Sequence, residues 1–560
     1  MAPDHLGVDM DADVLIRNGK IVDGTGNPAF VGDVAFARGK IAAVGPRLEV
    51  EASRIVDATG LVVSPGFVDP HTHCDVTAFV WPEQRNLATQ GTTTATSGQC
   101  GISAAPDSRT FWEYIRTICP YSATVFWGNV IPEDRQWESQ AEYAAAVNRT
   151  GVAIDIVPSI GHGNLRLSVG ARGPEPATPE QLEEMKRLLR QGLDDGAAGA
   201  TAGMSYDPNR YASYEEVLAL ARICAEYGRV YQFHAPYCAN AEAARYSVRL
   251  VRDSGVRLSI AHFQAPPQFA DEAEAMLAIV EQARAEGVDI SFNVMQDPHM
   301  VYSAAGWKSI FQWIANTYGG QTWTPEGFER DSADPAFRRR LARIVKEHIG
   351  QAADILPGYV RWLPKATLLR TGSADIDGWT VADLAREHGA DPEEFAFDVI
   401  CGRSGLVPEG QDPILSLEFA GTEAFIEEAT LHEAGMPCTD LNTNESLPGL
   451  ADMTPWPGAY NTMPAFFRAS LRRGAGTEET VRHMTSLPAA SMNLFDRGIL
   501  RPGLKADVVV FDEAAFAPRA TYEDLTAPAA GLSWSFVSGV PIVEQGLQNG
   551  ESPGRMVSVG

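Results

Sequence analysis

The stretch PGFVDPHTHCD, residues 65–75, places two histidines, His71 and His73, directly after an apolar run. Side chains i and i+2 of a β-strand point to the same face, so both imidazoles can reach one metal ion. Neutral imidazole is the commonest nitrogen ligand for zinc. One H-x-H pattern alone is weak evidence, but further ligand-type residues follow at the ends of later predicted strands. The stretch therefore predicts a buried strand that ends at a metal site.

Apolar, strand-like runs alternate with helical patterns through the centre of the chain. Helical runs such as PEQLEEMKRLLRQGLDDG and SYEEVLALARICAEYG lie between the strands. Eight strands that alternate with helices predict an α/β fold, a parallel (β/α) barrel of the TIM type rather than an open, doubly wound sheet. In chain order, the eight predicted strands are SPGFVDPHTH, GTTTATSGQC, VAIDIVPSIGH, GAAGATAGMSY, RVYQFHAP, RLSIAHFQA, VDISFNV and MPCTDLN.

Both ends of the chain consist of short strands separated by turn signals such as Asn-Gly and Asp-Gly. Neither end alone offers enough strands for a core, so we expect one small β-sandwich built from both termini. After the seventh barrel strand, the gap from about residue 296 to residue 421 is too long for a loop and predicts a helical insertion. We expect residues 1–64 and 491–560 to form the sandwich, and residues 65–490 to form the barrel with its insertion.

The composition is that of an ordinary globular protein with an acidic surface. Of 560 residues, 45% are hydrophobic and 21% are charged, and the formal net charge is -27 with a pI near 4.8. This charge, without a basic stripe, argues against nucleic acid or an anionic membrane as partner. We expect the partner to be a small-molecule substrate. No run reaches the roughly 18 apolar residues of a membrane helix, and the first residues lack a leader pattern, so we expect a cytoplasmic protein. The seven cysteines suit reduced thiols, and the oligomeric state is not indicated.

Polar residues of the type that binds metals close six of the eight predicted strands. Barrel enzymes assemble their sites from the C-terminal ends of several strands. A lone histidine at a strand end is more often a satisfied core or capping group, and a lone cysteine a small buried hydrophobe. Six ligand-type residues and one carboxylate at the same end of one barrel instead indicate a metal-dependent active site. They are His71, His73, Cys100, His162, His234, His262 and Asp440.

With these residues in place, the chain resembles the amidohydrolase superfamily and, within it, the N-acyl-D-amino-acid deacylase (D-aminoacylase) family. The resemblance extends from about residue 12 to the C-terminus and is weakest in the insertion. It implies a zinc-dependent hydrolase that cleaves a linear N-acyl amide bond. The matching segments are PGFVDPHTHCD, GQCGIS, SIGHGNLR, GMSYDPNRYAS, FHAP, IAHFQ, MTSLPA and DRGILRPGLKADVVVFD.

The resemblance also implies a ligand set. Cys100, His234 and His262 would hold one zinc tightly. A second, weaker metal position would lie near His71 and His73, with Cys100 able to bridge the two metals. Many relatives with two metals use a carboxylated lysine on strand four as the bridge, but GAAGATAGMSYD contains no lysine. A cysteine thiolate can supply the missing negative charge and binds zinc readily.

Asp440, in CTDLN, matches the strand-eight aspartate of the superfamily, although its position alone fits a helix N-cap equally well. The resemblance implies that it takes a proton from the attacking water and later passes it to the leaving amine. His162, in GHGN, could hydrogen-bond the substrate carbonyl or be structural. Tyr206 and Arg210, in SYDPNRYAS, are further candidate substrate-binding residues.

Substrate recognition is where the sequence departs from the family pattern. The family holds the substrate carboxylate with a lysine two residues after the strand-six histidine, an arginine in an HPR segment and a tyrosine in a YPY segment. Gln264 stands at the first of these positions and Gly458 at the second. The YPY segment is absent around residues 292–293. Loss of the arginine and the lysine together removes the usual way to bind a carboxylate.

Two features could compensate for this loss. Arg210 could supply the charge from the loop after strand four, or it could be a solvated surface arginine. Alternatively, the substrate lacks a carboxylate and binds through aromatic side chains, unless these side chains only form the core of a lid. The tryptophans in question are Trp81, after the H-x-H loop, and Trp307, Trp313, Trp323 and Trp362, in the insertion.

Three functional hypotheses follow from the sequence. The first is a zinc amidohydrolase that cleaves an N-acyl or related amide bond. The second is a hydrolase with the same site that acts on an ester, a cyclic amide or an activated C–C bond. The third is a barrel that has lost turnover and serves as a binding protein, which the intact ligand set and Asp440 argue against. The altered carboxylate-binding positions favour a shifted substrate over lost catalysis.

Overall fold

The computed structural model describes residues 11–111, 113, 136–235, 240–304, 307–308, 311–312, 315–316, 323–352, 363–409, 411, 413–418, 421–441, 457–522 and 524–559. Eight parallel barrel strands lie at the positions predicted from the sequence, and the predicted fold class is confirmed. The third strand is interrupted at Ser159, so it consists of two segments. In chain order, the strands are β6 (Phe67–Asp69), β7 (Thr92–Ser97), β8 (Asp155–Pro158) with β9 (Ile160–Gly161), β10 (Gly199–Gly203), β11 (Val230–His234), β12 (Arg257–Ile260), β13 (Ile290–Met295) and β17 (Gly435–Cys438).

The barrel closes where the last strand meets the first. The backbone N–H of Asp440, after β17, donates to the carbonyl of His71, after β6, at 3.0 Å. The buried carboxylate of Asp69 accepts hydrogen bonds from the backbone N–H of His71 and from the hydroxyl of Thr439, at 3.0 and 2.8 Å. Strands one and eight are therefore joined at the end that carries the candidate ligands.

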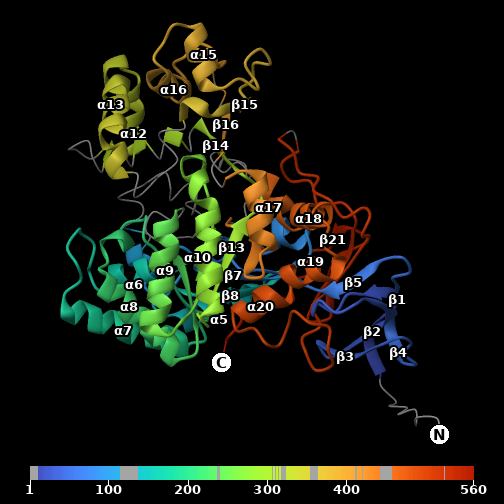
Figure 1. Cartoon of the computed structure of the whole chain (residues 1–560). Helices are drawn as coiled ribbons and strands as arrows, with labels where there is room; N and C mark the ends of the chain where they lie inside the picture. Colours follow the sequence, from blue (N-terminus) through green and yellow to red (C-terminus); the bar gives the residue numbers. More distant parts are fainter. Residues whose placement is uncertain are drawn as a thin grey trace.

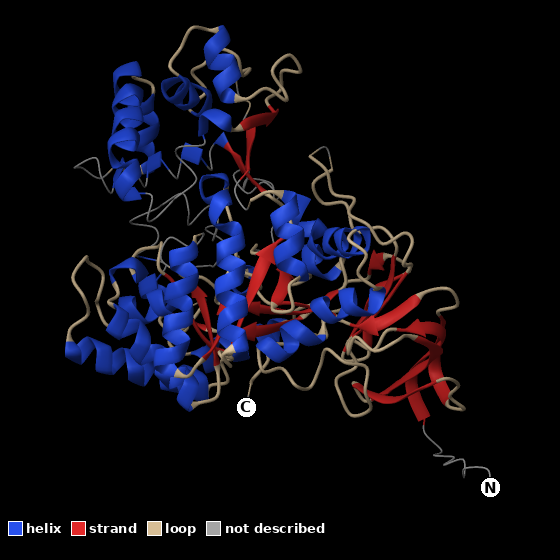
Figure 2. Ribbon diagram, in the orientation of Figure 1, coloured by secondary structure: helices blue, strands red, loops and turns tan. Residues whose placement is uncertain are grey.

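Helices cover the outside of the barrel (Figures 1 and 2). In α7, Pro179–Asp194, the Thr178 side chain accepts from the backbone of Gln181, whose side chain accepts from Thr178 in return. This capping box and the proline at the first position fix the start of the helix. Its apolar residues recur at helical spacing and are buried against the strands. The other helices around the barrel are α1 (Cys74–Thr77), α2 (Arg85–Ala88), α5 (Gln140–Thr150), α6 (His162–Ser168), α8 (Tyr214–Glu226), α9 (Ala241–Ser254), α10 (Ala273–Ala285), α17 (Glu423–Leu431), α18 (Pro457–Arg472), α19 (Thr477–Met484) and α20 (Ser486–Ser491).

The two ends of the chain form one nine-stranded sheet, in the order β21-β20-β19-β18-β5-β1-β2-β3 with β4 paired to β1. The chain ends meet where β5 pairs antiparallel with β18. Phe36 and Phe536, one from each end, pack edge to face with ring centroids 5.5 Å apart. The domain shared by both termini is thus present, while the divisions at residues 64 and 490 remain predictions. The strands are β1 (Asp11–Ile21), β2 (Phe30–Ala37), β3 (Lys40–Gly45), β4 (Glu51–Asp57), β5 (Val62–Pro65), β18 (Val508–Phe511), β19 (Leu532–Val537), β20 (Val540–Glu544) and β21 (Leu547–Gln548).

A buried group of charges connects the barrel to the C-terminal segment. The carboxylate of Asp155, at the start of β8, lies 2.7 Å from the guanidinium of Arg497 and also pairs with the ammonium of Lys505. Lys505 lies 3.2 Å from Asp507, so two cations and two carboxylates alternate. Because Asp155 and Arg497 are almost fully buried, each charge depends on its partners for compensation.

The insertion after β13 contains helices, as predicted, and also a three-stranded antiparallel sheet in the order β14-β16-β15. Trp307 and Trp323 are buried in the core of the insertion, which supports the interpretation that they pack inside a lid. Trp81 is buried as well. Trp313 and Trp362 lie outside the described residues. Its elements are β14 (His299–Ser303), α12 (Pro325–Ser332), α13 (Pro335–Ala352), β15 (Thr367–Arg370), α15 (Val381–Glu387), α16 (Pro392–Ile400) and β16 (Ile414–Glu418).

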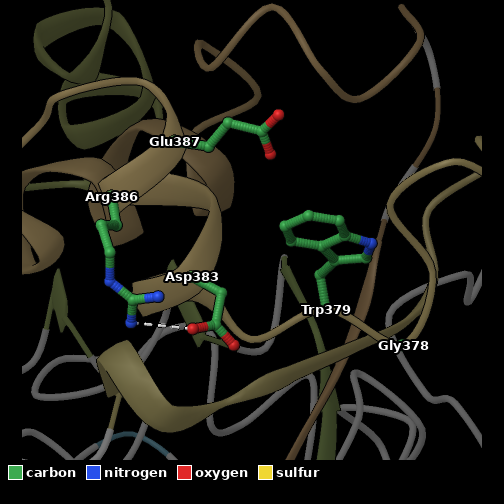
Figure 3. Close-up of a pocket in the computed structure, with 5 residues that line it drawn as sticks. All are labelled: Gly378, Trp379, Asp383, Arg386 and Glu387. Carbon is green, nitrogen blue, oxygen red and sulfur yellow. Dashed lines mark hydrogen bonds and ion pairs between the residues drawn. The ribbon is translucent and has the colours of Figure 1, made fainter.

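The insertion contacts the barrel through a small apolar cluster of Met295, Ile414 and Cys438. An open hollow on the insertion is lined by Trp379 and by charged side chains of α15, where Arg386 donates to Asp383 (Figure 3). Among the described residues, no helix is both long and apolar enough to cross a membrane.

Candidate active site

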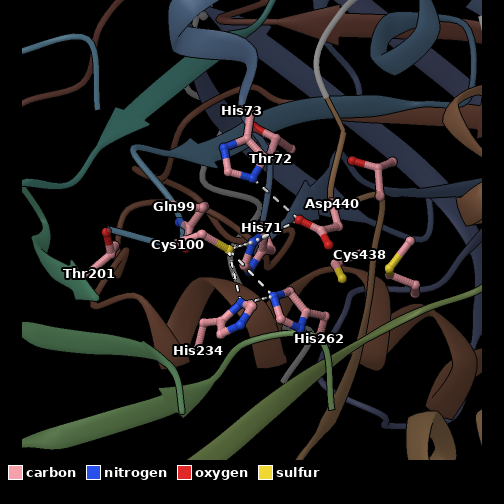
Figure 4. A network of polar contacts seen from close by, with 12 residues as sticks. His71, Thr72, His73, Gln99, Cys100, Thr201, His234, His262, Cys438 and Asp440 are labelled. Atoms are coloured by element: carbon pink, nitrogen blue, oxygen red, sulfur yellow. Dashed lines mark hydrogen bonds and ion pairs between the residues drawn. The ribbon is translucent and has the colours of Figure 1, made fainter. Parts of the chain in front are cut away.

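Four potential metal ligands lie together inside the barrel mouth. One ligand atom each from His71, Cys100, His262 and Asp440 can be chosen so that all lie within 4.8 Å of one another (Figure 4). The Sγ atom of Cys100 is 3.5 Å from Nε2 of His71 and 3.4 Å from Nε2 of His262. Nε2 of His71 is 3.0 Å from a carboxylate oxygen of Asp440. Residues from strands one, two, six and eight therefore converge on one point.

Two further predicted ligands border this cluster. Nδ1 of His234, at the end of β11, lies 2.7 Å from Nε2 of His262 and 3.7 Å from Sγ of Cys100. Nε2 of His73 lies 3.4 Å from the Asp440 carboxylate. The structure thus brings all five predicted metal ligands and the predicted catalytic aspartate together. Their roles as ligands and as catalyst remain predictions.

Backbone conformations at the strand ends aim these side chains. Cys100, His262 and Asp440 have φ angles of 54°, 31° and 54°, a region that residues with side chains rarely adopt. Such conformations persist only where the surroundings hold them, and they cluster at functional sites. For His262, the side-chain oxygen of Asn293 accepts from its backbone N–H at 2.7 Å. The strained positions therefore coincide with the ligand cluster.

The electrostatics of the cluster suit a cationic metal. Burial lowers the pKa of His71, lowers that of His234 well below its usual value, and lowers that of His262 to about 4. These imidazoles are therefore neutral near pH 7, the form that binds a metal. Burial raises the pKa of Asp440, but the neighbouring imidazoles, including hydrogen bonds from His71 and His73, outweigh burial and hold it well below its usual range. Neutral imidazoles, a thiol and an ionised carboxylate form a donor set that fits zinc.

Several supporting residues were not found by sequence analysis. Gln99 donates to the side-chain oxygen of Gln232 at 2.7 Å, and Gln232 donates to the carbonyl of Pro70 at 2.9 Å. This chain of hydrogen bonds ties the Cys100 turn to the loop before His71. Gln99 stands within the GQCGIS segment, but no spacing in the sequence indicates its partner on β11.

The predicted substrate-binding residues are distributed around the cluster. The ring centroid of Tyr206 lies 4.9 Å from the ring centroid of His234. Gln264 is buried, with its side-chain nitrogen 3.0 Å from Sδ of Met295. Arg210 is held by an ion pair with Asp207 and a hydrogen bond to the hydroxyl of Tyr211.

His162 belongs to a different set of contacts. Its Nε2 lies 2.7 Å from the carboxylate of Glu216, on α8, which also accepts two hydrogen bonds from Arg166. All three side chains are buried. The structure therefore places His162 in an ion-paired network and not in the ligand cluster, which supports the structural alternative for this residue.

The chain is similar in sequence and in fold to proteins of known activity. The amidohydrolase family model matches residues 54–230. N-acyl-D-glutamate deacylase of Alcaligenes xylosoxydans xylosoxydans is 28% identical over 97% of this chain and 96% of its own length. D-aminoacylase of the same organism is 26% identical over 98% and 97%. The crystal structure of N-acyl-D-glutamate deacylase from Bordetella bronchiseptica, with zinc and a phosphonate inhibitor that mimics the tetrahedral intermediate, superposes with a TM-score of 0.73 at 25% identity, over 98% of this chain and 100% of that chain. These findings confirm the family resemblance predicted from the sequence.

Proposed function

We propose that this amidohydrolase cleaves the N-acyl amide bond of a small molecule with the help of bound zinc. One observation carries the proposal: ligand atoms of His71, Cys100, His262 and Asp440 lie within 4.8 Å of one another at the barrel mouth. The similarity to N-acyl-D-amino-acid deacylases over nearly the whole chain supports the amide as the bond attacked.

Cys100, His234 and His262 would hold the tightly bound zinc, and His71 and His73 would serve a second, weaker position. Zinc supplies Lewis-acid polarisation of a carbonyl and lowers the pKa of water. The chain contributes the orientation of the ligands. Asn293 holds the backbone of His262, and the hydrogen bonds through Gln99 and Gln232 hold the Cys100 turn.

Asp440 is suited to move the proton in this reaction. Its carboxylate is ionised near neutral pH and lies 3.0 Å from His71 and 3.4 Å from His73. An ionised carboxylate at this position accepts a proton from the attacking water. The same group then returns the proton to the leaving amine nitrogen, so that the carboxylate is regenerated after each turnover.

We further propose that the substrate is less acidic than an N-acyl-D-amino acid with a free carboxylate. Gln264, two residues beyond the ligand His262, is a neutral side chain, and its buried Oε1 has no hydrogen-bond partner among the described residues. The charge of Arg210 is already compensated by Asp207. A carboxylate buried without a paired cation costs several kcal/mol, so it would bind poorly here.

A hydrolysis screen tests both parts of this proposal. Zinc-loaded protein is offered N-acetyl-D-amino acids, their L-enantiomers, neutral aromatic amides, cyclic amides and esters, and protein without metal is the control. We expect the neutral or bulky amides to exceed N-acetyl-D-amino acids in kcat/KM by at least about tenfold. Hydrolysis of cyclic amides or esters alone would contradict the linear-amide assignment. No turnover of any substrate by the metal-loaded protein would favour a binding protein.

The variant Arg210→Ala tests whether Arg210 binds the carboxylate of N-acetyl-D-amino acids. If they are efficient substrates and Arg210→Ala abolishes their binding, the cation that binds the carboxylate has moved to the loop after β10. If they are efficient and Arg210→Ala changes nothing, the proposed loss of carboxylate recognition is wrong. Tyr211→Phe, which removes only a hydroxyl that contacts Arg210, serves as the milder control.

A further inference from the structure

The turn that carries Cys100 has an improbable backbone. Gly98, Cys100 and Gly101 all have positive φ angles, of 75°, 54° and 75°. Glycine adopts this region freely, whereas cysteine does so only when its surroundings hold it. The conformation has a clear effect, because it places Sγ within 3.4–3.7 Å of nitrogen atoms of His71, His234 and His262.

One side chain from β10, the fourth barrel strand, connects the two ends of this turn, which follows the second strand. The hydroxyl of Thr201, on β10, accepts a hydrogen bond from the backbone N–H of Gly101 at 3.0 Å. The same hydroxyl donates to the carbonyl of Gly98 at 2.6 Å. A threonine hydroxyl can make one donated and one accepted bond at the same time, so Thr201 uses both on the turn. Thr201 is fully buried, so water does not replace it in either bond.

A second position on β10 provides the space that the turn occupies. Gly203 lies two residues after Thr201 and therefore on the same face of the strand. A Cβ atom at Gly203 would lie only 2.1 Å from the carbonyl oxygen of Cys100. The small residues of strand four, GATAG, thus allow the cysteine turn to rest directly on the strand.

We propose that Thr201 is a positioning residue for the metal site, because it holds the turn that aims the thiol of Cys100 at the three imidazoles. Gly203 is the matching contact that keeps the turn close to β10. The inference rests on the metal site of the proposed function and adds to it a residue that contacts neither metal nor substrate. Figure 4 shows Thr201 beside Cys100 and away from the histidines.

Cobalt substitution tests this role directly. A thiolate bound to Co²⁺ gives a sulfur-to-cobalt charge-transfer absorption in the near ultraviolet, which reports Cys100 without any substrate. We expect Thr201→Val to weaken this absorption and to weaken Co²⁺ binding by at least about tenfold, the usual effect of removing a partner that orients a ligand. Thr201→Ser retains the hydroxyl and should restore both signals. Circular dichroism verifies that each variant is folded.

Thr430→Val is a matched control. The hydroxyl of Thr430, on α17, accepts from Gln296 at 3.0 Å and donates to the carbonyl of Ile426 at 2.6 Å, so this variant also loses one accepted and one donated hydrogen bond, the first partly buried and the second buried. We expect the cobalt spectrum of the Thr430→Val protein to match that of the unmodified protein. If Thr201→Val does not fold, Gly203→Ala provides the second test, because it displaces the Cys100 carbonyl and should also weaken the absorption.

The possible failures are distinguishable. A folded Thr201→Val protein with unchanged charge-transfer absorption and unchanged Co²⁺ affinity would overturn the positioning role and leave the metal site intact. Unmodified protein that binds Co²⁺ without any thiolate absorption would instead overturn Cys100 as a ligand, and with it the proposed metal site.

Discussion

At the scale of single residues, the site depends on residues whose backbone φ angle is one that residues with side chains rarely adopt. Cys100, His262 and Asp440 all lie in the positive-φ region. Contacts from other strands or loops of the barrel hold each of them: Thr201 bonds the turn of Cys100, Asn293 accepts from the backbone of His262, and the backbone of Asp440 donates to the carbonyl of His71. The ligand geometry therefore depends on several strands of the barrel and not on the ligand residues alone.

Asp440→Asn should leave the metal bound and the fold intact but lower kcat by at least about a hundredfold, because an amide cannot accept the proton from water. Zinc content by elemental analysis and kcat on the best substrate of the screen measure the two effects. Asp383→Asn, which alters an exposed carboxylate of the insertion, is the control and should retain full activity. An active Asp440→Asn enzyme would show that this aspartate only orients its neighbours.

The candidate metal ligands could be predicted from the sequence, whereas the residues that hold them in place could not. His71, Cys100 and Asp440 stand at strand ends in segments with recognisable chemistry. Thr201 stands in a run of small residues, and only the fold reveals that its hydroxyl reaches the Cys100 turn, about a hundred residues earlier. The sequence left both a substrate contact and a structural role open for His162, and only the fold shows that its imidazole pairs with Glu216, on a helix.

At the scale of elements, charge pairs anchor the barrel to the segments around it. The first residue of β8, Asp155, is compensated by Arg497 and Lys505 from the chain that leads into β18. Burial raises the pKa of Asp155, but Lys505 and Arg497 outweigh burial and lower it. A lowered pKa means that ionised Asp155 stabilises the fold above its unfolded pKa of about 4, and that this stability is lost as the pH falls.

Arg497→Met should therefore destabilise the protein by about 3–5 kcal/mol at pH 7, because it leaves Asp155 buried with one cation fewer. The difference in the free energy of unfolding between the variant and the unmodified protein should be smaller at pH 4, because protonation of Asp155 removes the unpaired charge. Burial raises the pKa of Asp507, and Arg497 opposes this rise, so removal of Arg497 disfavours the ionised form of both carboxyl groups. Urea unfolding at the two pH values measures the effect, and exposed Arg501→Met is the control. An equal loss of unfolding free energy at both pH values would contradict the electrostatic explanation.

The elements themselves were predictable to different degrees. The eight barrel strands are short apolar runs separated by amphipathic helices, and their spacing alone indicates the barrel. The three-stranded sheet of the insertion was not predicted, because its strands at residues 299–303, 367–370 and 414–418 are far apart in sequence and pair only after the chain folds.

At the scale of the whole molecule, the candidate ligands come from five strands that lie around the barrel ring: β6, β7, β11, β12 and β17. A metal held by such ligands links parts of the chain that are up to about 370 residues apart. Because a metal that binds only the folded state stabilises it, a metal bound at this site would contribute to the stability of the fold as well as to the proposed catalysis.

Removal of zinc by a chelator should therefore lower the thermal midpoint of unfolding, and added zinc should restore it. With free zinc about a hundredfold above its Kd, the stabilisation is about 2.7 kcal/mol. Cys100→Ala should lose most of this zinc-dependent shift, whereas Cys224→Ala, which changes a buried cysteine on α8, should retain it. Differential scanning calorimetry measures the midpoints. A midpoint that does not respond to chelator or zinc would contradict a metal site in the folded protein.

The sheet shared by both termini cannot be completed until the ribosome has translated nearly the whole chain. β5 ends at Pro65, and its antiparallel partner β18 begins at Val508, roughly 440 residues later. At about 5–20 residues per second, a ribosome needs roughly 20–90 s to translate that interval. During this time the edge of β5 is a template for pairing with other nascent chains. The N-terminal strands are therefore the segment that most needs shielding during translation, and a circular permutant that places residues 508–548 before Asp11 would remove the delay.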